Sequence, residues 1–309
     1  MFKKASNNLL GLIFVVLLLV VVIFFFLDSG KNERTFREVL VDIDTSAVTQ
    51  IFVFSKANNY QPVKVFKHNN KWHVELRNGK TASVTEQKIK QTFLELTSII
   101  PKRLAARNKE KWSEFQVDST GTRVQVFEGD NPTLDIVIGR FNYQQQPRSV
   151  STYVRLYKDV DVYEVDGFLA LTFNQDANAF RDGTVIKDDS NSWTKLQFNY
   201  PADSSFTLSK INNKWYVKNI EADSAKTANY LRRLSNLSQN KFADDVVIQT
   251  EQKPTYKLTI SNEKLEFIEV AAYVDSTNYV LISSENPETK FDGKSFGNTI
   301  FVSYKSFLK

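Results

Sequence analysis

One eight-residue phrase occurs twice in this chain of 309 residues. Residues 67–74 read KHNNKWHV and residues 210–217 read KINNKWYV, with six of the eight positions identical. In each copy an Asn-Asn pair lies between short runs of alternating apolar residues, and Asn tolerates the positive φ angles of a two-residue turn. Each copy therefore predicts a β-hairpin. The strands would span residues 63–66 and 72–74 in the first copy and 206–208 and 215–217 in the second.

An amphipathic helix is predicted after each hairpin. Residues 83–99 carry apolar side chains at helical spacing, and Ser83 with Glu86 forms the S-x-x-E capping box of a helix start. Residues 223–237 repeat this pattern, with Asp223 or Ser224 as the N-cap. Both copies therefore continue from hairpin to helix in the same order.

The similarity extends through a meander of four strands after each helix. Alternating segments at 122–128, 133–138, 153–156 and 162–169 correspond to segments at 255–261, 264–273, 279–282 and 300–308. A period of this length predicts duplication of a whole domain rather than a solenoid repeat. Trp72 and Trp215 would be equivalent core residues of the two hairpins, because a buried aromatic ring seats a hairpin on its helix.

A second strong feature is the apolar segment 9–27, LLGLIFVVLLLVVVIFFFL, which carries no charge. At 1.5 Å per residue it would span roughly 28 Å, close to the hydrocarbon thickness of a bilayer. A cleaved signal peptide is the alternative, although the segment is long for one and no small-residue cleavage site follows it. Basic residues on both sides leave the orientation open, and we expect the short tail inside and the folded region outside.

The predicted fold class is α+β, with a single N-terminal transmembrane helix followed by two tandem, internally duplicated units of antiparallel sheet, each with one amphipathic helix. The predicted organisation is a cytoplasmic tail at 1–8, a transmembrane anchor at 9–27 and a juxtamembrane linker at 28–44. A first repeat at 45–175, a connector at 176–192 and a second repeat at 193–309 complete it.

Composition and motifs argue against several functional classes. The net charge is +5, and no basic stripe with a recognition helix indicates a nucleic-acid partner. The basic run at 101–111 is interpreted as a solvated connection, with a lipid or polyanion contact as the alternative. The sequence has no Cys and contains no phosphate-binding glycine loop, nucleophile elbow or zinc-binding HExxH motif.

No catalytic, cofactor-binding or metal-binding residue is therefore predicted, and we expect the protein not to be an enzyme and to hold no cofactor. His68 and His73 are interpreted as surface residues of the first hairpin, because the second copy has Ile211 and Tyr216 in their places. The carboxylates of Asp182, Asp188, Asp189, Asp244 and Asp245 indicate no geometry by themselves. A hydrolase would require a pocket with two or more carboxylates of strongly shifted pKa.

The order of several motifs resembles a family of bacterial membrane-anchored proteins, the domain of unknown function 4340. The resemblance rests on the two NNKW phrases, on KWSEFQVDSTGTRVQV at 111–126, on TYVRLYKDVDVYEVDG at 152–167 and on FRD at 180–182. Members look like companions of ABC-2-type exporters, including those related to gliding-motility transporters. The resemblance thus implies a non-enzymatic accessory subunit of an ABC-type transporter or cell-envelope assembly. It would lie in the bacterial inner membrane with its large C-terminal region in the periplasm, and its partner would be an ABC-2-type permease or another envelope membrane protein.

An envelope glycan- or lipid-binding module is the alternative function. Tyr143, Tyr153 and Tyr157, near the QQQPRSVS segment, would then be the residues that contact the ligand, although tyrosines in sheets are usually packing residues.

Overall fold

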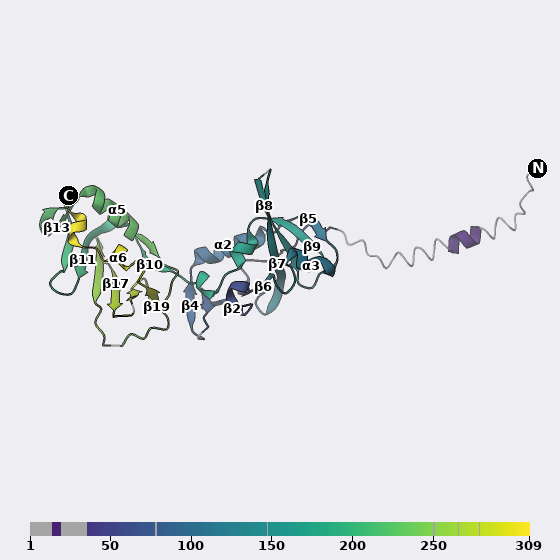
Figure 1. Ribbon diagram of the computed structural model, residues 1–309, viewed down its shortest axis with the longest axis horizontal. Helices are drawn as coiled ribbons and strands as arrows, with labels where there is room; N and C mark the ends of the chain where they lie inside the picture. The colour runs from purple at the N-terminus through teal and green to yellow at the C-terminus, as the bar shows by residue number, and fades with distance from the viewer. Residues whose placement is uncertain are drawn as a thin grey trace, which may run out of the picture. The chain divides into compact units, whose positions relative to one another are not determined.

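The computed structural model describes residues 14–19, 36–77, 79–146, 148–249, 251–264, 266–277 and 279–309. The chain divides into two units, residues 1–40 and 41–309, and all strands of the described residues lie in the second. Two large antiparallel sheets contain nearly all of its strands (Figure 1). The predicted limits at 45–175, 176–192 and 193–309 stay predictions as domain boundaries.

The first sheet has nine strands in the order β4-β3-β2-β1-β6-β7-β8-β9-β5. Its strands are β1 (Val48–Phe54), β2 (Pro62–His68), β3 (Lys71–Glu75), β4 (Thr81–Val84), β5 (Pro101–Ala106), β6 (Thr122–Glu128), β7 (Asn131–Gln145), β8 (Arg148–Leu156) and β9 (Val162–Asp166). Its helical segments are η1 (Lys56–Asn58), α2 (Glu86–Thr97), η2 (Lys109–Lys111), α3 (Trp112–Phe115) and α4 (Leu169–Phe173).

The second sheet has eight strands in the order β14-β13-β12-β11-β16-β17-β18-β19. These are β11 (Trp193–Asn199), β12 (Phe206–Ile211), β13 (Lys214–Val217), β14 (Ile220–Glu221), β16 (Tyr256–Asn262), β17 (Phe267–Val274), β18 (Tyr279–Ser283) and β19 (Asn286–Asp292). Strands β10 (Thr184–Lys187) and β15 (Asn236–Ser238) form a separate pair. The helical segments here are η3 (Ala177–Ala179), η4 (Ser190–Ser192), α5 (Ser224–Leu234), α6 (Gly297–Ile300) and η5 (Tyr304–Phe307).

The two sheets share one strand order, apart from the ninth strand β5 of the first. In both, the first strand lies between the hairpin and the meander, so β1 pairs with β2 and β6, and β11 pairs with β12 and β16. A register shift lies at the same place in each: between Val48 and Gln50 in β1, and between Trp193 and Lys195 in β11. A bulge at the same place in both sheets supports a common origin of the two repeats, because bulges are specific features of a sheet.

The two-residue turns of the repeated phrase are confirmed. Asn69 and Asn70 have φ angles of 48° and 61°, and Asn212 and Asn213 have φ angles of 50° and 63°. Positive φ at both central residues is the geometry of a type I′ turn, whose twist matches that of the flanking strands. The prediction of equal burial for the two tryptophans is wrong, because Trp72 is buried whereas Trp215 is half-buried.

Both predicted amphipathic helices are present, with shorter bounds. The N-cap of α2 is Thr85, whose hydroxyl accepts a hydrogen bond from the Lys88 amide. The predicted capping residue Ser83 instead lies in β4, because the chain remains paired with β3 up to Val84. The N-cap of α5 is Asp223, which accepts from the Lys226 amide.

The last predicted strand, at 300–308, is wrong. These residues form the end of α6 and the turn η5, and the fourth meander strand is β19 at Asn286–Asp292. The alternation at 300–304 resembles a strand, but Ile300 and Phe307 reach the core from short helical turns. Strand β10 lies inside the predicted connector and pairs with β15.

The fold-class prediction is wrong in its membrane helix and underestimates the sheet. In the described part of the chain no helix is long and apolar enough to cross a membrane. Of segment 9–27 only residues 14–19 are described, as helix. The remainder of the predicted anchor, the tail at 1–8 and most of the linker at 28–44 lie outside the described residues.

Candidate binding site

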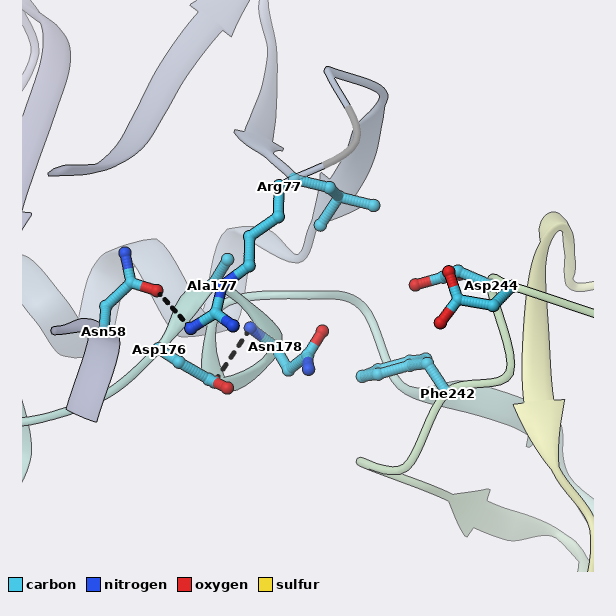
Figure 2. A pocket seen from close by; sticks show the side chains of 9 residues that line it. Asn58, Arg77, Asp176, Ala177, Asn178, Phe242 and Asp244 are labelled. Atoms are coloured by element: carbon cyan, nitrogen blue, oxygen red, sulfur yellow. Dashed lines mark hydrogen bonds between the residues drawn. The ribbon is translucent and has the colours of Figure 1, made fainter. Parts of the chain in front are cut away.

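A polar groove lies between connecting segments of the two repeats: η1 and the turn after β3, the segment after α4, and the segment after β15 (Figure 2). Its volume is about 250 Å³. The lining residues are Asn58, Leu76, Arg77, Asp176, Ala177, Asn178, Phe242, Asp244 and Asp245. Figure 2 shows Phe242 and Asp244 pointing toward Asn178 from the opposite side of the cavity. We refer to this cavity as the junction groove.

Arg181, the middle residue of the FRD motif, lies next to the groove and is 2% exposed. Its guanidinium donates two hydrogen bonds to the Asp244 carboxylate, at 2.5 and 2.9 Å. The guanidinium carbon also lies 3.7 Å from the centre of the Phe242 ring. A bidentate ion pair over an aromatic face is a strong way to hold a buried arginine. The Arg181 Nε is buried and has no hydrogen-bond partner among the described residues.

Local hydrogen bonds shape the wall of the groove on the other side. The Asp176 carboxylate accepts from the amides of Asn178 and Ala179 and caps the 3₁₀ turn η3. The Arg77 Nη2 donates to Asn58 Oδ1 at 3.1 Å, as Figure 2 shows. Asn58 is buried, and its amide nitrogen donates to the Gln61 carbonyl at 2.9 Å. These bonds hold the polar groups of this wall in place.

Asp182, the last residue of the FRD motif, connects strands of both sheets. Its amide donates to the Ser83 carbonyl of β4 at 2.7 Å, and its carbonyl accepts from Asn286 Nδ2 of β19 at 2.9 Å. Lys88 of α2 donates to the Ala179 carbonyl. Burial lowers the pKa of Lys88, and the charge of Asp182 opposes this change. The FRD motif therefore ties the first sheet to the second through main-chain and side-chain contacts.

The charged residues at the groove differ in their engagement. Both carboxylate oxygens of Asp244 accept from Arg181, so this carboxylate is committed to the structure. Asp245 and Arg77 are exposed and place one charge of each sign at the groove. Within the described residues no group of three or more His, Cys, Asp or Glu side chains could hold a metal ion.

The other carboxylates considered in the sequence serve local structure. Asp188 accepts from the Trp193 indole nitrogen at 2.6 Å, and Asp189 caps η4. Burial, with the charges of Asp188 and Asp182, raises the pKa of Glu285. The structure therefore brings Asp182 and Asp244 to the junction, while Asp188 and Asp189 lie at the start of β11.

The remaining candidate residues divide between surface and core. His68 and His73 lie on the first hairpin with ring centres 6.4 Å apart; His68 is exposed and His73 is half-buried. Tyr143 and Tyr157 are exposed, whereas Tyr153 is 5% exposed and packs on Phe115.

The basic run at 101–111 begins with a regular β-strand, although its composition indicates a solvated connection. Residues 101–106 form the edge strand β5, where Lys102 pairs with Asp166 at 2.6 Å and Arg103 pairs with Glu164. Charged residues on an edge strand oppose pairing with another chain.

Sequence reasoning missed the roles of Arg181 and Phe242. Arg181 lies in a polar, turn-rich segment, and no periodic pattern marks it as buried. Its partner follows 63 residues later, so no local rule connects the two. The only signal in the sequence is the FRD motif itself, which the resemblance had singled out.

Together the fold and the groove define a tandem antiparallel-sheet protein with a polar site at the junction of its repeats. Residues 72–260 match the family model described as Domain of unknown function (DUF4340), and the chain belongs to this family. The match begins at Trp72, inside the first repeated phrase, and includes the whole of the second phrase. Arg181 and Asp244 also lie within it. No curated protein and no solved structure matches the chain.

Proposed function

We propose that this protein is a non-enzymatic accessory subunit of an ABC-type transporter or cell-envelope assembly and that it binds its partner at the junction groove. The observation that supports this most directly is the ion pair between Arg181 and Asp244 beside a groove whose lining includes the exposed side chains of Arg77 and Asp245. A charge pair of this kind fixes geometry rather than entering a reaction. The choice of an ABC-2-type permease as the partner rests on the family resemblance.

The groove suits a segment of a partner protein. Arg77 follows β3 of the first repeat and Asp245 follows β15 of the second repeat, so a bound segment would contact both repeats at once. Contacts that span two rigid elements give specificity, because a partner must match both charges and their spacing. Small polar sites of this size need further contacts around them for stable association.

Site-specific photo-crosslinking in cells tests this proposal. A photoreactive amino acid replaces Asp245 at the groove, and the matched control replaces Phe267, which is 61% exposed on β17. We expect a covalent adduct with a permease subunit from position 245 and none from position 267. Equal adducts from both positions, or recovery of the protein alone at native expression, would count against the proposal.

The proposed location is the periplasm, which the family resemblance supports. A C-terminal alkaline phosphatase fusion should be active in cells, because this enzyme matures outside the cytoplasm. The location would be wrong if the phosphatase fusion were inactive and a C-terminal fusion to a fluorescent protein, which is bright in the cytoplasm, were fluorescent.

A glycan- or lipid-binding function is the second candidate, and exposed aromatic rings favour it. Phe141 and Tyr143 of β7 are 42% and 53% exposed, and Phe141 lies 5.9 Å from the ring of Phe168, which is 46% exposed. Clustered exposed apolar side chains commonly mark interaction sites. Glycan-array binding that is lost on Tyr143→Ala would favour this function over the accessory subunit.

A further inference from the structure

A second groove lies on the second repeat, between α5 and the C-terminal segment. Figure 1 shows α5 beside the C-terminal end of the chain, and two hydrogen bonds join them. Lys226 Nζ donates to the Leu308 carbonyl at 2.6 Å, and the Tyr230 hydroxyl donates to the Ile300 carbonyl at 2.6 Å. The groove has a volume of about 450 Å³, within the range of roughly 300–1,000 Å³ typical of small-molecule pockets.

One stripe of α5 supplies a wall of this groove. Lys226, Asn229, Tyr230 and Arg233 lie three or four residues apart and therefore share one face of the helix. Arg232 joins them at the edge, where its Nη2 donates to Asn229 Oδ1 at 3.0 Å. We call the cavity the basic groove, because its charged lining residues are Lys226, Arg232 and Arg233 and no carboxylate is among its described lining residues.

The floor of the basic groove is apolar. Tyr230 and Phe307 are 4% and 1% exposed, and their rings meet edge to face at 5.1 Å. Val302, which is half-buried, adds an aliphatic surface on the C-terminal side. Exposed cations above an apolar floor match a ligand with one anionic end and one hydrocarbon end, since each part meets its preferred surroundings.

The two arginines of the basic groove are specific to this repeat. Counted from the N-cap residues Thr85 and Asp223, the positions of Arg232 and Arg233 are occupied by Leu94 and Glu95 in α2. Buried positions match in the same alignment, since Ile89 corresponds to Thr227 and Leu96 to Leu234. The duplication therefore preserved the inner face of the helix, while the outer face of α5 acquired two arginines.

We propose that the basic groove binds a single-chain anionic amphiphile, a fatty acid or an alkyl phosphate. The anionic head lies against Arg232, Arg233 and Lys226, and the chain lies on Tyr230 and Phe307. Arginine suits this role because its planar fork pairs with two oxygens of a carboxylate or phosphate. This ligand site is separate from the junction groove and is independent of the proposed partner there.

Calorimetric titration of the full-length protein tests this inference with four probes. Octyl phosphate and octanoate carry both parts of the ligand, inorganic phosphate carries the charge alone, and octanol carries the chain alone. We expect saturable binding of octyl phosphate or octanoate that is at least about tenfold tighter than that of either partial probe. Equal affinity for inorganic phosphate or for octanol would overturn the inference.

Vesicles distinguish a membrane surface from a free amphiphile. We expect soluble octyl phosphate to bind without any vesicle present. Binding to phosphatidylglycerol vesicles without binding of octyl phosphate or octanoate would overturn the proposal in favour of a membrane surface.

The repeat itself provides the matched substitutions. In the double variant Arg232→Leu with Arg233→Glu, α5 carries the residues found at the same places in α2. We expect this variant to lose about tenfold or more in affinity for octyl phosphate, because two charge-assisted contacts disappear. The control, Lys187→Leu with Lys195→Glu, makes the same change in net charge at two exposed lysines outside the groove.

Thermal melting separates a binding effect from a folding effect. Both double variants should melt close to the wild-type protein, because all four residues are exposed. A second variant, Arg232→Lys with Arg233→Lys, keeps the charge and should retain most of the binding. Equal loss of affinity in the double lysine control and in the variant Arg232→Leu with Arg233→Glu would overturn the assignment to this groove.

Discussion

Arg181 and Asp244 meet across the junction of the two repeats, with guanidinium and carboxylate joined by hydrogen bonds of 2.5 and 2.9 Å. The Arg181 side chain is 2% exposed and that of Asp244 is 29% exposed. The ring of Phe242 lies 3.7 Å below the guanidinium carbon. This pair connects the segment after α4 with the segment after β15, and it stabilises both the junction and the groove beside it.

Removing one partner of this ion pair should destabilise the protein. We expect Arg181→Met to lower the free energy of unfolding by about 2–4 kcal/mol, because it leaves the Asp244 carboxylate partly buried and unpaired. The matched control is Lys90→Met, at an exposed pair with Glu86, which should cost under about 0.5 kcal/mol. Urea unfolding measures both. A double-mutant cycle with Asp244→Asn that shows no coupling would contradict the assigned role of the pair.

The two repeated tryptophans should differ in their contribution to stability. Trp72 is 8% exposed and packs edge to face on Phe93 at 5.9 Å, so Trp72→Ala should cost about 3–5 kcal/mol. Trp215 is half-buried, and its replacement by Ala should cost about 1–3 kcal/mol because less apolar area is lost. Thermal melts compare the two variants. A larger loss for Trp215 would show that the half-buried ring contributes more than its area indicates.

The hairpin turns should tolerate glycine better than alanine. Asn213 has a φ angle of 63°, where an alanine costs about 1–2 kcal/mol and a glycine has no steric cost. We expect Asn213→Ala to lower stability by about 1 kcal/mol and Asn213→Gly to change it by less than about 0.5 kcal/mol. Chemical denaturation distinguishes the two. Similar losses in both variants would mean that the Asn side chain, rather than the backbone angle, stabilises the turn.

Stability should fall in alkaline solution because of buried phenols. Burial raises the pKa of Tyr279 to about 12, with a smaller contribution from Tyr256. An unfolded tyrosine loses its proton near pH 10, so between about pH 10 and 12 only the unfolded state is ionised. The stabilising contribution is complete below about pH 10 and is lost as the pH rises toward about 12. Urea unfolding at several pH values should show a shallower decline in Tyr279→Phe, and an unchanged slope would contradict this origin.

The tyrosines near the β7–β8 hairpin should separate into a packing residue and a surface residue. Tyr153 is 5% exposed, lies 4.4 Å from Phe115 and has Arg140 over its ring at 5.0 Å. We expect Tyr153→Ala to cost about 2–4 kcal/mol, as for other large core truncations. Tyr143→Ala should leave the melting temperature nearly unchanged, because its side chain is 53% exposed. A destabilising Tyr143 variant would show that the hairpin packs more tightly than its exposure indicates.

Features that depend on neighbouring residues could be predicted from the sequence. The Asn-Asn pairs predicted the two-residue turns, and Asp223 predicted the start of α5. Both rules act within a few residues, where backbone angles and capping bonds are decided by local sterics and hydrogen bonding. The membership of the family could likewise be predicted from short motifs in a fixed order.

Features that depend on the whole chain were decided by tertiary structure. The strand β19 has the polar sequence NPETKFD, and it pairs because β18 lies beside it. Ile300 and Phe307 follow an alternating pattern, yet they fill the core from helical turns. Arg181 and Asp244 are 63 residues apart, and neither side chain carries a local signal of its partner. Such contacts become favourable only after the sheets have formed and removed water around the charges, so the sequence determined the repeated elements and tertiary packing determined the site between them.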